Sequence, residues 1–363
     1  MSNVKLETLT AVHVGSGNFL QNRTEFFQSG NALYVTDERK VLDIIGTNHV
    51  QEWIQSISQR NSIVDVVHRF APHAAPDTFS KRRMECYNNL RPYDTLKESI
   101  HDGQGKPYIP GSSIKGAIRS AALATEAEKR HLKTASTNAS DSERLLFGKD
   151  PNHDIFRFLQ VGDAFFKSGS EIATRLVMHL NMTERSRNLV TIEKPQLIEA
   201  IREKCRSSFR LNINQNGLTL TQKYLGIQTQ PFFMSSIPAL INMCNEHTIK
   251  LLNRELDFWD AQKNYQGAEK YLNAVDEILE KAEQCLGTNS CVLRLGHAVG
   301  WEFITGGWVR DEQGEIPEMI IKKARPHNDR YESYPFPKSR RAEESLSDDR
   351  GGLIGFVKLT LED

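Results

Sequence analysis

The sequence predicts a mixed α+β protein whose strands are mostly antiparallel. Apolar and polar residues alternate near both ends of the chain, and two internal regions carry apolar residues at helical spacing. Strands and helices do not alternate regularly along the chain. A doubly wound parallel sheet requires that alternation, so this class is excluded.

The N-terminal part contains the first strands and a helical insertion. Alternation from Val4 to Val14 predicts a strand that ends at a turn formed by Gly15–Gly17, and a second short strand covers Ala32–Val35. Apolar residues between Val41 and Phe70 recur at helical spacing, which we interpret as a helical insertion.

A helix with a clear start follows further along the chain. Pro110 and Gly111 break any strand, Ser112 or Ser113 can cap a helix, and apolar residues then recur at helical spacing to about Arg130. Beyond it we expect strands at 156–166, 172–182, 209–220 and 353–361, a strand-like Gly-rich segment at 292–301, and helices across 231–286. Residues 134–142 read as a polar loop, and 255–283 as a solvated acidic face.

Length and composition limit the class of protein. The chain has 363 residues, equal numbers of basic and acidic residues (46 each), and 25% charged residues, which excludes a largely disordered protein. At about 150 residues per domain, one large or two ordinary domains are expected, and we place two at 1–220 and 221–363. Five scattered cysteines without a CxxC motif argue against a disulfide framework or zinc knuckle. With no signal-type or membrane-spanning stretch, we expect a cytoplasmic protein that does not bind membranes.

The helix start near Ser112 is the most informative local motif. Free backbone amides and the helix dipole favour an anion at such a position. Lys115 and Arg119 lie one turn apart on the same face, where a phosphate chain could bind both. The alternative is the solvated basic face of an ordinary amphipathic helix.

Three further segments are candidates for ligand contact. His13 stands beside the Gly15–Gly17 turn, although a lone strand-end histidine is more often structural. His297 lies between Gly296 and Gly300, where glycines permit close backbone approach; a tight hairpin with a core tryptophan is the alternative. The basic stretch with Lys338, Arg340 and Arg341 forms either a phosphate-contacting patch or a solvated loop.

Together, these segments resemble a known family. Leu9–Gly17, Tyr108–Arg119, Leu293–Trp301 and Pro337–Arg341, followed by Gly355–Leu359, are similar to segments of the RAMP superfamily of CRISPR-associated proteins. Within it, the chain most resembles the fifth Csm subunit of type III-A effector complexes. The resemblance implies an RRM-like (ferredoxin-like) fold with helical insertions.

The resemblance also implies a function. Such a subunit binds guide RNA through its backbone and shape, and caps the filament at the 3′ part of the guide. It would support guide maturation, with other Csm subunits as partners, the repeating backbone subunit as neighbour, and host ribonucleases as possible visitors. Carried over to this sequence, the RNA-binding residues are His13, Gly15, Ser16, Gly17, Ser112, Ser113, Lys115, Gly116, Arg119, Arg294, Gly296, His297, Gly300, Lys338, Arg340 and Arg341.

Catalysis is not expected. The repeating backbone subunit of the family cleaves RNA with a loop aspartate after its first strand, whereas Glu25 is the only acid between Gly17 and Val35 here. We therefore expect no catalytic residue, metal or cofactor. A metal-dependent endoribonuclease, a repeating backbone subunit and a protein-interaction cap without RNA contact are the alternatives.

Overall fold

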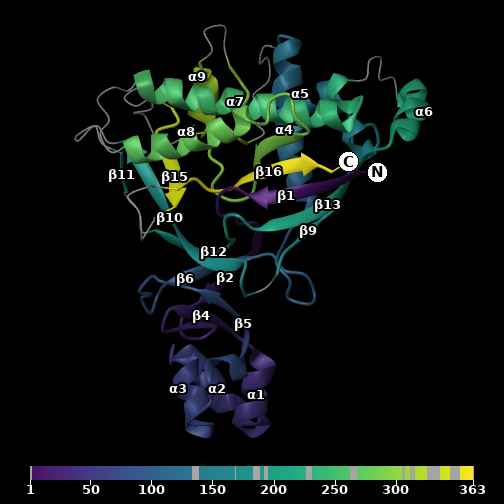
Figure 1. Cartoon of the computed structure of the whole chain (residues 1–363). Coiled ribbons are helices and arrows are strands. Elements are labelled where there is room, and N and C mark those ends of the chain that lie inside the picture. The colour runs from purple at the N-terminus through teal and green to yellow at the C-terminus, as the bar shows by residue number, and fades with distance from the viewer. Residues whose placement is uncertain are drawn as a thin grey trace.

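The structure is a computed structural model, and two β-sheets with flanking helices make up most of it (Figure 1). It describes residues 2–132, 139–167, 169–182, 189–191, 195–225, 231–261, 268–304, 307–310, 315–324, 336–343 and 352–362.

The first sheet brings the two ends of the chain together. Its strand β1 (Ser2–Thr8) pairs antiparallel with both β13 (Arg206–Ile213) and β16 (Phe356–Leu361). The full order is β14-β16-β1-β13-β8, with β14 at Ser290–Arg294 and β8 at Leu159–Val161. The N- and C-terminal ends therefore lie side by side (Figure 1).

Helices cover one face of this sheet. The long helix α7 (Ile237–Ala261) packs on β14 and α4 (Gly111–Lys129), and α8 (Glu269–Glu283) packs on α7 and β14 (Figure 1). The apolar spacing seen in the sequence is the cause: Ile114, Ile118 and Ala121 fall on one buried face of α4. Shorter helices are α5 (Ala139–Phe147), α6 (Gln215–Leu225) and α9 (Glu318–Ala324).

The second sheet is larger and mixed. Its order is β2 (Gly15–Gln21), β6 (Thr95–Ser99), β12 (Gln196–Ile201), β10 (Ile172–Met182), β5 (Ser80–Glu85), β4 (Ala32–Thr36) and β3 (Phe26–Ser29). Two more strands, β11 (Leu189–Thr191) and β15 (Ser339–Glu343), pair with β10, and a separate ribbon joins β7 (Tyr108–Ile109) to β9 (Ala164–Phe165). The β10–β5 and β12–β6 pairings are parallel and the others antiparallel, which confirms the expected α+β class.

A small lobe extends from one edge of the second sheet. Helices α1 (Glu38–Ile45), α2 (Val50–Ser58) and α3 (Ile63–Phe70) share a separate apolar core with β3 and β4, at the lower end of Figure 1. The helical insertion expected at 41–70 is confirmed. Within the second sheet, a buried ion pair joins β5 to β12: Arg82 donates through Nε to Glu199 Oε1 at 3.0 Å.

Some expected strand boundaries were wrong. The first strand ends at Thr8 because the chain then leaves the first sheet, and the Val12 amide donates to Ile201 O of the second sheet at 2.9 Å. The segment 209–220 is a strand only to Ile213 and then becomes α6. The segment 156–166 begins as a 3₁₀ turn before the short strands β8 and β9. The last strand begins at Phe356 rather than Leu353.

Other expectations can be compared with the described residues. Residues 172–182 form one strand as expected, and all five cysteines are free thiols. Residues 134–138 of the expected polar loop lie outside the described part, and α5 begins at Ala139. Strands from both 1–220 and 221–363 share the first sheet, and the division into two domains stays a prediction. None of the described helices is long and apolar enough to cross a membrane.

Candidate nucleic-acid interface

The Gly-rich loop after β14, which contains Gly296, His297 and Gly300, contacts the segment that follows β1. The His297 amide donates to the carbonyl oxygen of His13 at 2.8 Å. Gly296 has φ +83°, and a Cβ there would lie 2.4 Å from His13 O, so only glycine permits this approach. Two of the four family segments are thus brought together.

The His13 side chain lies behind the surface rather than on it. The imidazole is fully buried, with Nδ1 2.6 Å from Glu199 O and 3.1 Å from Ser99 Oγ. Burial, followed by the charge of Lys97, holds the pKa of His13 below its ordinary value, although Glu199 acts in the opposite direction. The neutral ring therefore supports the interface, and the expectation of direct RNA contact by this side chain is not supported by its position.

Residues Gly15–Gly17 do not form a turn, contrary to expectation. They begin β2, the exposed edge strand of the second sheet. A Cβ on Gly15 would lie 3.1 Å from Nε2 of His13, which explains a small residue there. Ser16 donates through Oγ to Glu98 Oε2 at 3.0 Å.

Four basic side chains gather beside this loop, and we call them the cationic cluster: Lys97, His179, His297 and Arg341. Lys97 Nζ lies 3.1 Å from His297 Nδ1, and His179 faces Arg341 in the β10–β15 register. Among the described residues, neither Lys97 nor Arg341 has a carboxylate within ion-pair distance. Glu343, on the same face of β15, is paired with Arg175 at 2.6 Å.

The pKa values reflect this crowding of positive charge. Burial and then Lys97, His13, Arg341 and His179 lower the pKa of His297 to about 3. Burial and then Arg341 lower the pKa of Lys97. Because every neighbouring charge disfavours a further proton, a bound phosphate would relieve repulsion within the cluster.

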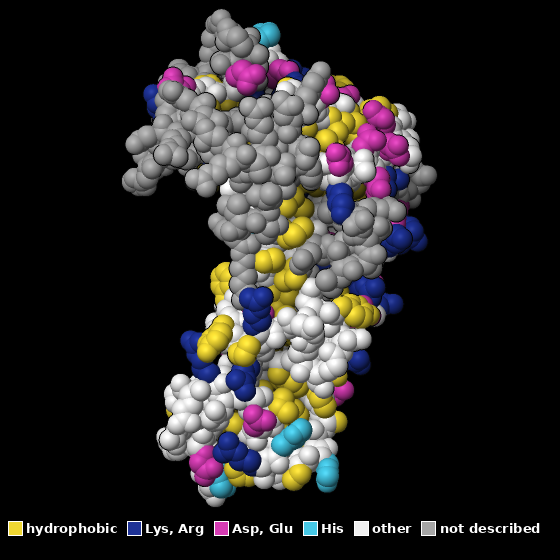
Figure 2. Space-filling model, turned by 90° about the vertical axis from the view of Figure 1, so that its left-hand side faces the viewer, with side chains coloured by type: hydrophobic (Ala, Val, Ile, Leu, Met, Phe, Trp, Pro, Cys, Tyr) yellow, Lys and Arg dark blue, Asp and Glu magenta, His cyan; other side chains and the backbone are white. Residues whose placement is uncertain are grey.

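An exposed aromatic ring completes the surface. Phe19 on β2 is 50% exposed, faces Lys97 in the register with β6, and has the Lys97 ammonium 5.9 Å from its ring centre. Figure 2 shows the left-hand side of Figure 1, where Lys and Arg side chains are interspersed with hydrophobic ones in the middle of the view, below the atoms drawn in grey. Cations beside an exposed ring suit single-stranded nucleic acid, whose phosphates and bases need different partners.

The N-terminus of α4 is closed by the protein itself. The helix begins at Gly111 after Pro110, and neither Ser112 nor Ser113 caps it. The Gly111 amide donates to Asp163 Oδ1 at 2.7 Å, and a Cβ there would lie 2.2 Å from Val161 O. An aspartate thus already binds the first amide of this helix start, and anion binding by the rest of it stays a prediction.

Lys115 and Arg119 also have internal partners. Lys115 donates to Leu159 O at 2.7 Å, and burial lowers its pKa. Arg119 pairs with Glu143 at 2.9 Å and Asp154 at 2.8 Å, and lies 5.0 Å from the ring centres of Phe147 and Phe156. Both side chains are partly buried, and their contact with guide phosphates stays a prediction. Gly116 and Ser112 are exposed.

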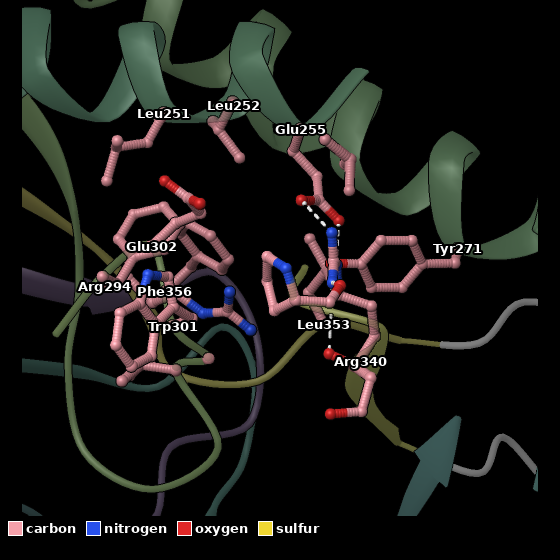
Figure 3. A pocket seen from close by; sticks show the side chains of 16 residues that line it. Leu251, Leu252, Glu255, Tyr271, Arg294, Trp301, Glu302, Arg340, Leu353 and Phe356 are labelled. Carbon is pink, nitrogen blue, oxygen red and sulfur yellow. Dashed lines mark hydrogen bonds and ion pairs between the residues drawn. The ribbon is translucent and has the colours of Figure 1, made fainter. Parts of the chain in front are cut away.

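Arg294 and Arg340 are buried, contrary to the expectation that they face RNA. Arg294 donates to Ile354 O at 3.0 Å and to Ala298 O at 3.2 Å, and stacks on Phe356. Arg340 pairs with Glu255 of α7 (Figure 3). They line a cavity of about 30 Å³, enough for about one water molecule.

The remaining predicted residues lie near the surface. Gly300 is exposed with φ +77°, and Lys338 is partly buried just before β15. Sequence reasoning missed Lys97, His179 and Phe19. Their signal was weak: polar or aromatic residues at alternate positions of strands that carry no motif. Among the described residues, no three His, Cys, Asp or Glu side chains are grouped to hold a metal ion.

Comparisons with known proteins relate this chain to a family. The model of the RAMP superfamily matches residues 5–298. A Methanocaldococcus jannaschii protein described as "CRISPR system Cms protein Csm5" is 24% identical over 185 residues, which are 46% of this chain and 43% of that protein. The match thus spans less than half the length of that curated relative.

Two solved structures share the fold across nearly the whole chain. A chain of a cryo-EM structure described as a Csm-crRNA-target RNA ternary complex of a type III-A CRISPR-Cas system superposes with a TM-score of 0.70, at 20% identity and 100% coverage of both chains. The crystal structure of T. onnurineus Csm5 gives a TM-score of 0.62, at 19% identity, covering 97% of this chain and 99% of the other.

Proposed function

This chain belongs to the RAMP superfamily, and on that premise we propose that it is a non-catalytic, guide-RNA-binding subunit of a type III-A CRISPR effector complex. It would cap the backbone filament at the 3′ part of the guide and support guide maturation and complex assembly in antiviral defence. Other Csm subunits would be its partners in the cytoplasm, with the repeating backbone subunit as its neighbour. Host ribonucleases would be transient partners.

The cationic cluster is the observation that carries this proposal. Lys97, His297 and Arg341 converge from three segments that are far apart in the sequence, and the repulsion between the two cations, Lys97 and Arg341, favours an anionic ligand. A guide of any sequence must be held through phosphates rather than base edges, because base-edge contacts would restrict the guides that can be loaded. Phe19 would add a stacking surface that accepts any base.

The RNA path that we propose follows the open parts of the predicted site. Backbone approach would occur at Gly15–Gly17, Gly296 and Gly300, and Lys338 would extend the cationic cluster toward β15. On α4, Ser112 and Gly116 remain open to a ligand, whereas Lys115 and Arg119 serve the packing of the helix.

Purification of the tagged chain from its own host tests this proposal. A discrete RNA of guide size and several Csm proteins should co-purify with the wild-type chain. The double variant K97A/R341A should retain much less guide. The control R39A/K81A, which removes an exposed cation of α1 and one of β5, should retain the wild-type amount. Equal guide retention by both double variants would overturn the assignment of the interface.

Non-catalysis has a separate test. Glu25, the acid considered for a metal-dependent endoribonuclease, accepts a hydrogen bond from the Gln21 amide at 2.8 Å and so already stabilises the turn after β2. The purified chain should leave RNA intact in Mg²⁺. Cleavage that is lost in E25Q would replace the proposal with the enzyme alternative.

A further inference from the structure

We infer that the ion pair between Glu255 and Arg340 acts as a register lock. It fixes the register of β15 on β10 and thereby positions Arg341 in the cationic cluster. The inference rests on the proposed function, because it assigns Glu255 and Arg340 a role in presenting a cation to RNA. It also gives a reason for a buried ion pair in a region that the sequence analysis interpreted as a solvated acidic face.

Alternation along β15 places the two arginines on opposite sides of the strand. In the register with β10, Arg340 faces Leu180 and Arg341 faces His179. Leu180 packs against the apolar core below α7 and α8, as does Ala342 of β15. Arg341 therefore points to the other face, where Lys97, His297 and His179 lie.

Glu255 and Arg340 form a bidentate ion pair. Arg340 donates through Nε to Oε1 at 2.5 Å and through Nη2 to Oε2 at 2.9 Å (Figure 3). The Trp259 indole donates to the same carboxylate at 2.9 Å, and the Arg340 guanidinium lies 4.8 Å from the Phe258 ring centre. A planar guanidinium that donates two hydrogen bonds to one carboxylate has a fixed orientation as well as a fixed distance.

Both groups remain charged despite their burial. Burial acts to raise the pKa of Glu255, but Arg340 and hydrogen bonds from Trp259 and Tyr271 outweigh it and keep the pKa below its ordinary value. Removing one partner would leave the other charged and buried, which strongly disfavours the native arrangement.

The Glu255–Arg340 pair adds to the other contacts that define the register of this short strand. Among the described residues, the five residues of β15 pair with β10, Glu343 bridges to Gly352 and pairs with Arg175 of β10 at 2.6 Å, and Ala342 packs in the core. A shift by one residue would turn Arg341 toward α7 and Arg340 toward the cationic cluster. The tight fit of Arg340 to Glu255 makes that shift costly, so the ion pair selects which arginine reaches RNA.

Salt-dependent RNA binding by the purified full-length chain tests the lock. The probe is a labelled single-stranded RNA of mixed sequence and guide length, and the variants are E255Q, R340K, R341A and the double E255Q/R341A. E143Q, which breaks the Arg119 ion pair on α4, serves as the matched control. Thermal unfolding of each variant checks folding, and R340K provides the measurement if E255Q does not fold.

The lock predicts a specific pattern. E255Q and R340K should weaken RNA binding in the same direction as R341A, and each should reduce the slope of log K against log salt by up to about 0.7, the value of one phosphate contact on a single strand. E255Q/R341A should bind no more weakly than R341A alone, and E143Q should keep the wild-type slope.

Two results would overturn the inference, and a third would overturn the proposed RNA interface as well. An unchanged slope in E255Q and R340K, with K97A still weakening RNA binding, would show that the pair only stabilises the fold. Additive losses in E255Q/R341A would contradict an effect of Glu255 through Arg341. If K97A also bound RNA like the wild type, the proposed interface itself would be wrong.

Discussion

Lys97 and His297 are 200 positions apart in the sequence, yet Lys97 Nζ lies 3.1 Å from His297 Nδ1. A charged ammonium can donate here only if Nδ1 of the imidazole carries no proton. The pKa of about 3 for His297 is consistent with this arrangement. The contact therefore fixes a neutral histidine beside a charged lysine and links β6 to the Gly-rich loop.

This arrangement predicts acid destabilisation. The pKa of His297 and that of His13 are both lowered in the native state, chiefly by burial. As the pH falls through about 6.5, these histidines bind protons in the unfolded chain but not in the native state. The free energy of unfolding should therefore be constant above pH 6.5 and decrease below it. The slope per histidine is at most about 1.4 kcal/mol per pH unit. Urea unfolding between pH 7.5 and 5 measures it.

The variant H297Q provides the control for this prediction. It removes one titrating group and should flatten the fall of the free energy of unfolding below pH 6.5. A steeper fall in H297Q than in the wild type would contradict the assignment.

The Gly-rich loop offers a matched pair of substitutions. Gly296 and Gly300 both have positive φ, but a Cβ on Gly296 would meet His13 O at 2.4 Å, whereas nothing lies within 4 Å of one on Gly300. G300A should lose about 1 kcal/mol of stability from backbone strain, and G296A clearly more, because a backbone atom must move. Chemical denaturation measures both, and equal losses would argue against the close approach of loop and His13.

Phe19 should contribute to RNA affinity without changing its salt dependence. Stacking of one base is worth about 1–3 kcal/mol, so F19A should bind single-stranded RNA roughly 5- to 150-fold more weakly. Because the ring is half exposed, stability should change little, and F19W should restore binding. Fluorescence anisotropy across a salt series measures both quantities. A reduced salt slope in F19A would indicate that the loss acts through Lys97 instead of through stacking.

Arg119 should matter for stability and not for RNA. R119A leaves Glu143 and Asp154 without their cation and removes a guanidinium between two aromatic rings. We expect a loss of about 2 kcal/mol in the free energy of unfolding, with an unchanged salt slope of RNA binding. R119K should recover part of the stability. A stable R119A variant with a reduced slope of log K against log salt would show that Arg119 contacts RNA.

The sequence predicted elements best where local pattern determined them. The strand β10 and the helices between 41 and 70 carry strong periodicity, and the RAMP resemblance rested on segments of which two do meet in space. The chain path after Thr8 could not be predicted, because the change of sheet depends on hydrogen bonds to Ile201 and Phe356, which are distant in sequence.

The candidate site was predicted only in part for a related reason. A basic residue near a glycine motif looks the same whether it faces solvent or an acid elsewhere in the chain. Arg119 faces Glu143 and Asp154, and Arg340 faces Glu255, so both are internal. Lys97 was missed because its strand has no motif, and only the fold brings it to His297.

The salt dependence of RNA binding by the wild-type chain and by K97A/R341A tests the central claim most directly. If these two cations contact phosphates, the double variant should lose affinity, and its slope of log K against log salt should be smaller by about 1.4, two contacts of about 0.7 each. A double variant with the wild-type slope and affinity would contradict the account, and RNA would then have to bind another face of the molecule.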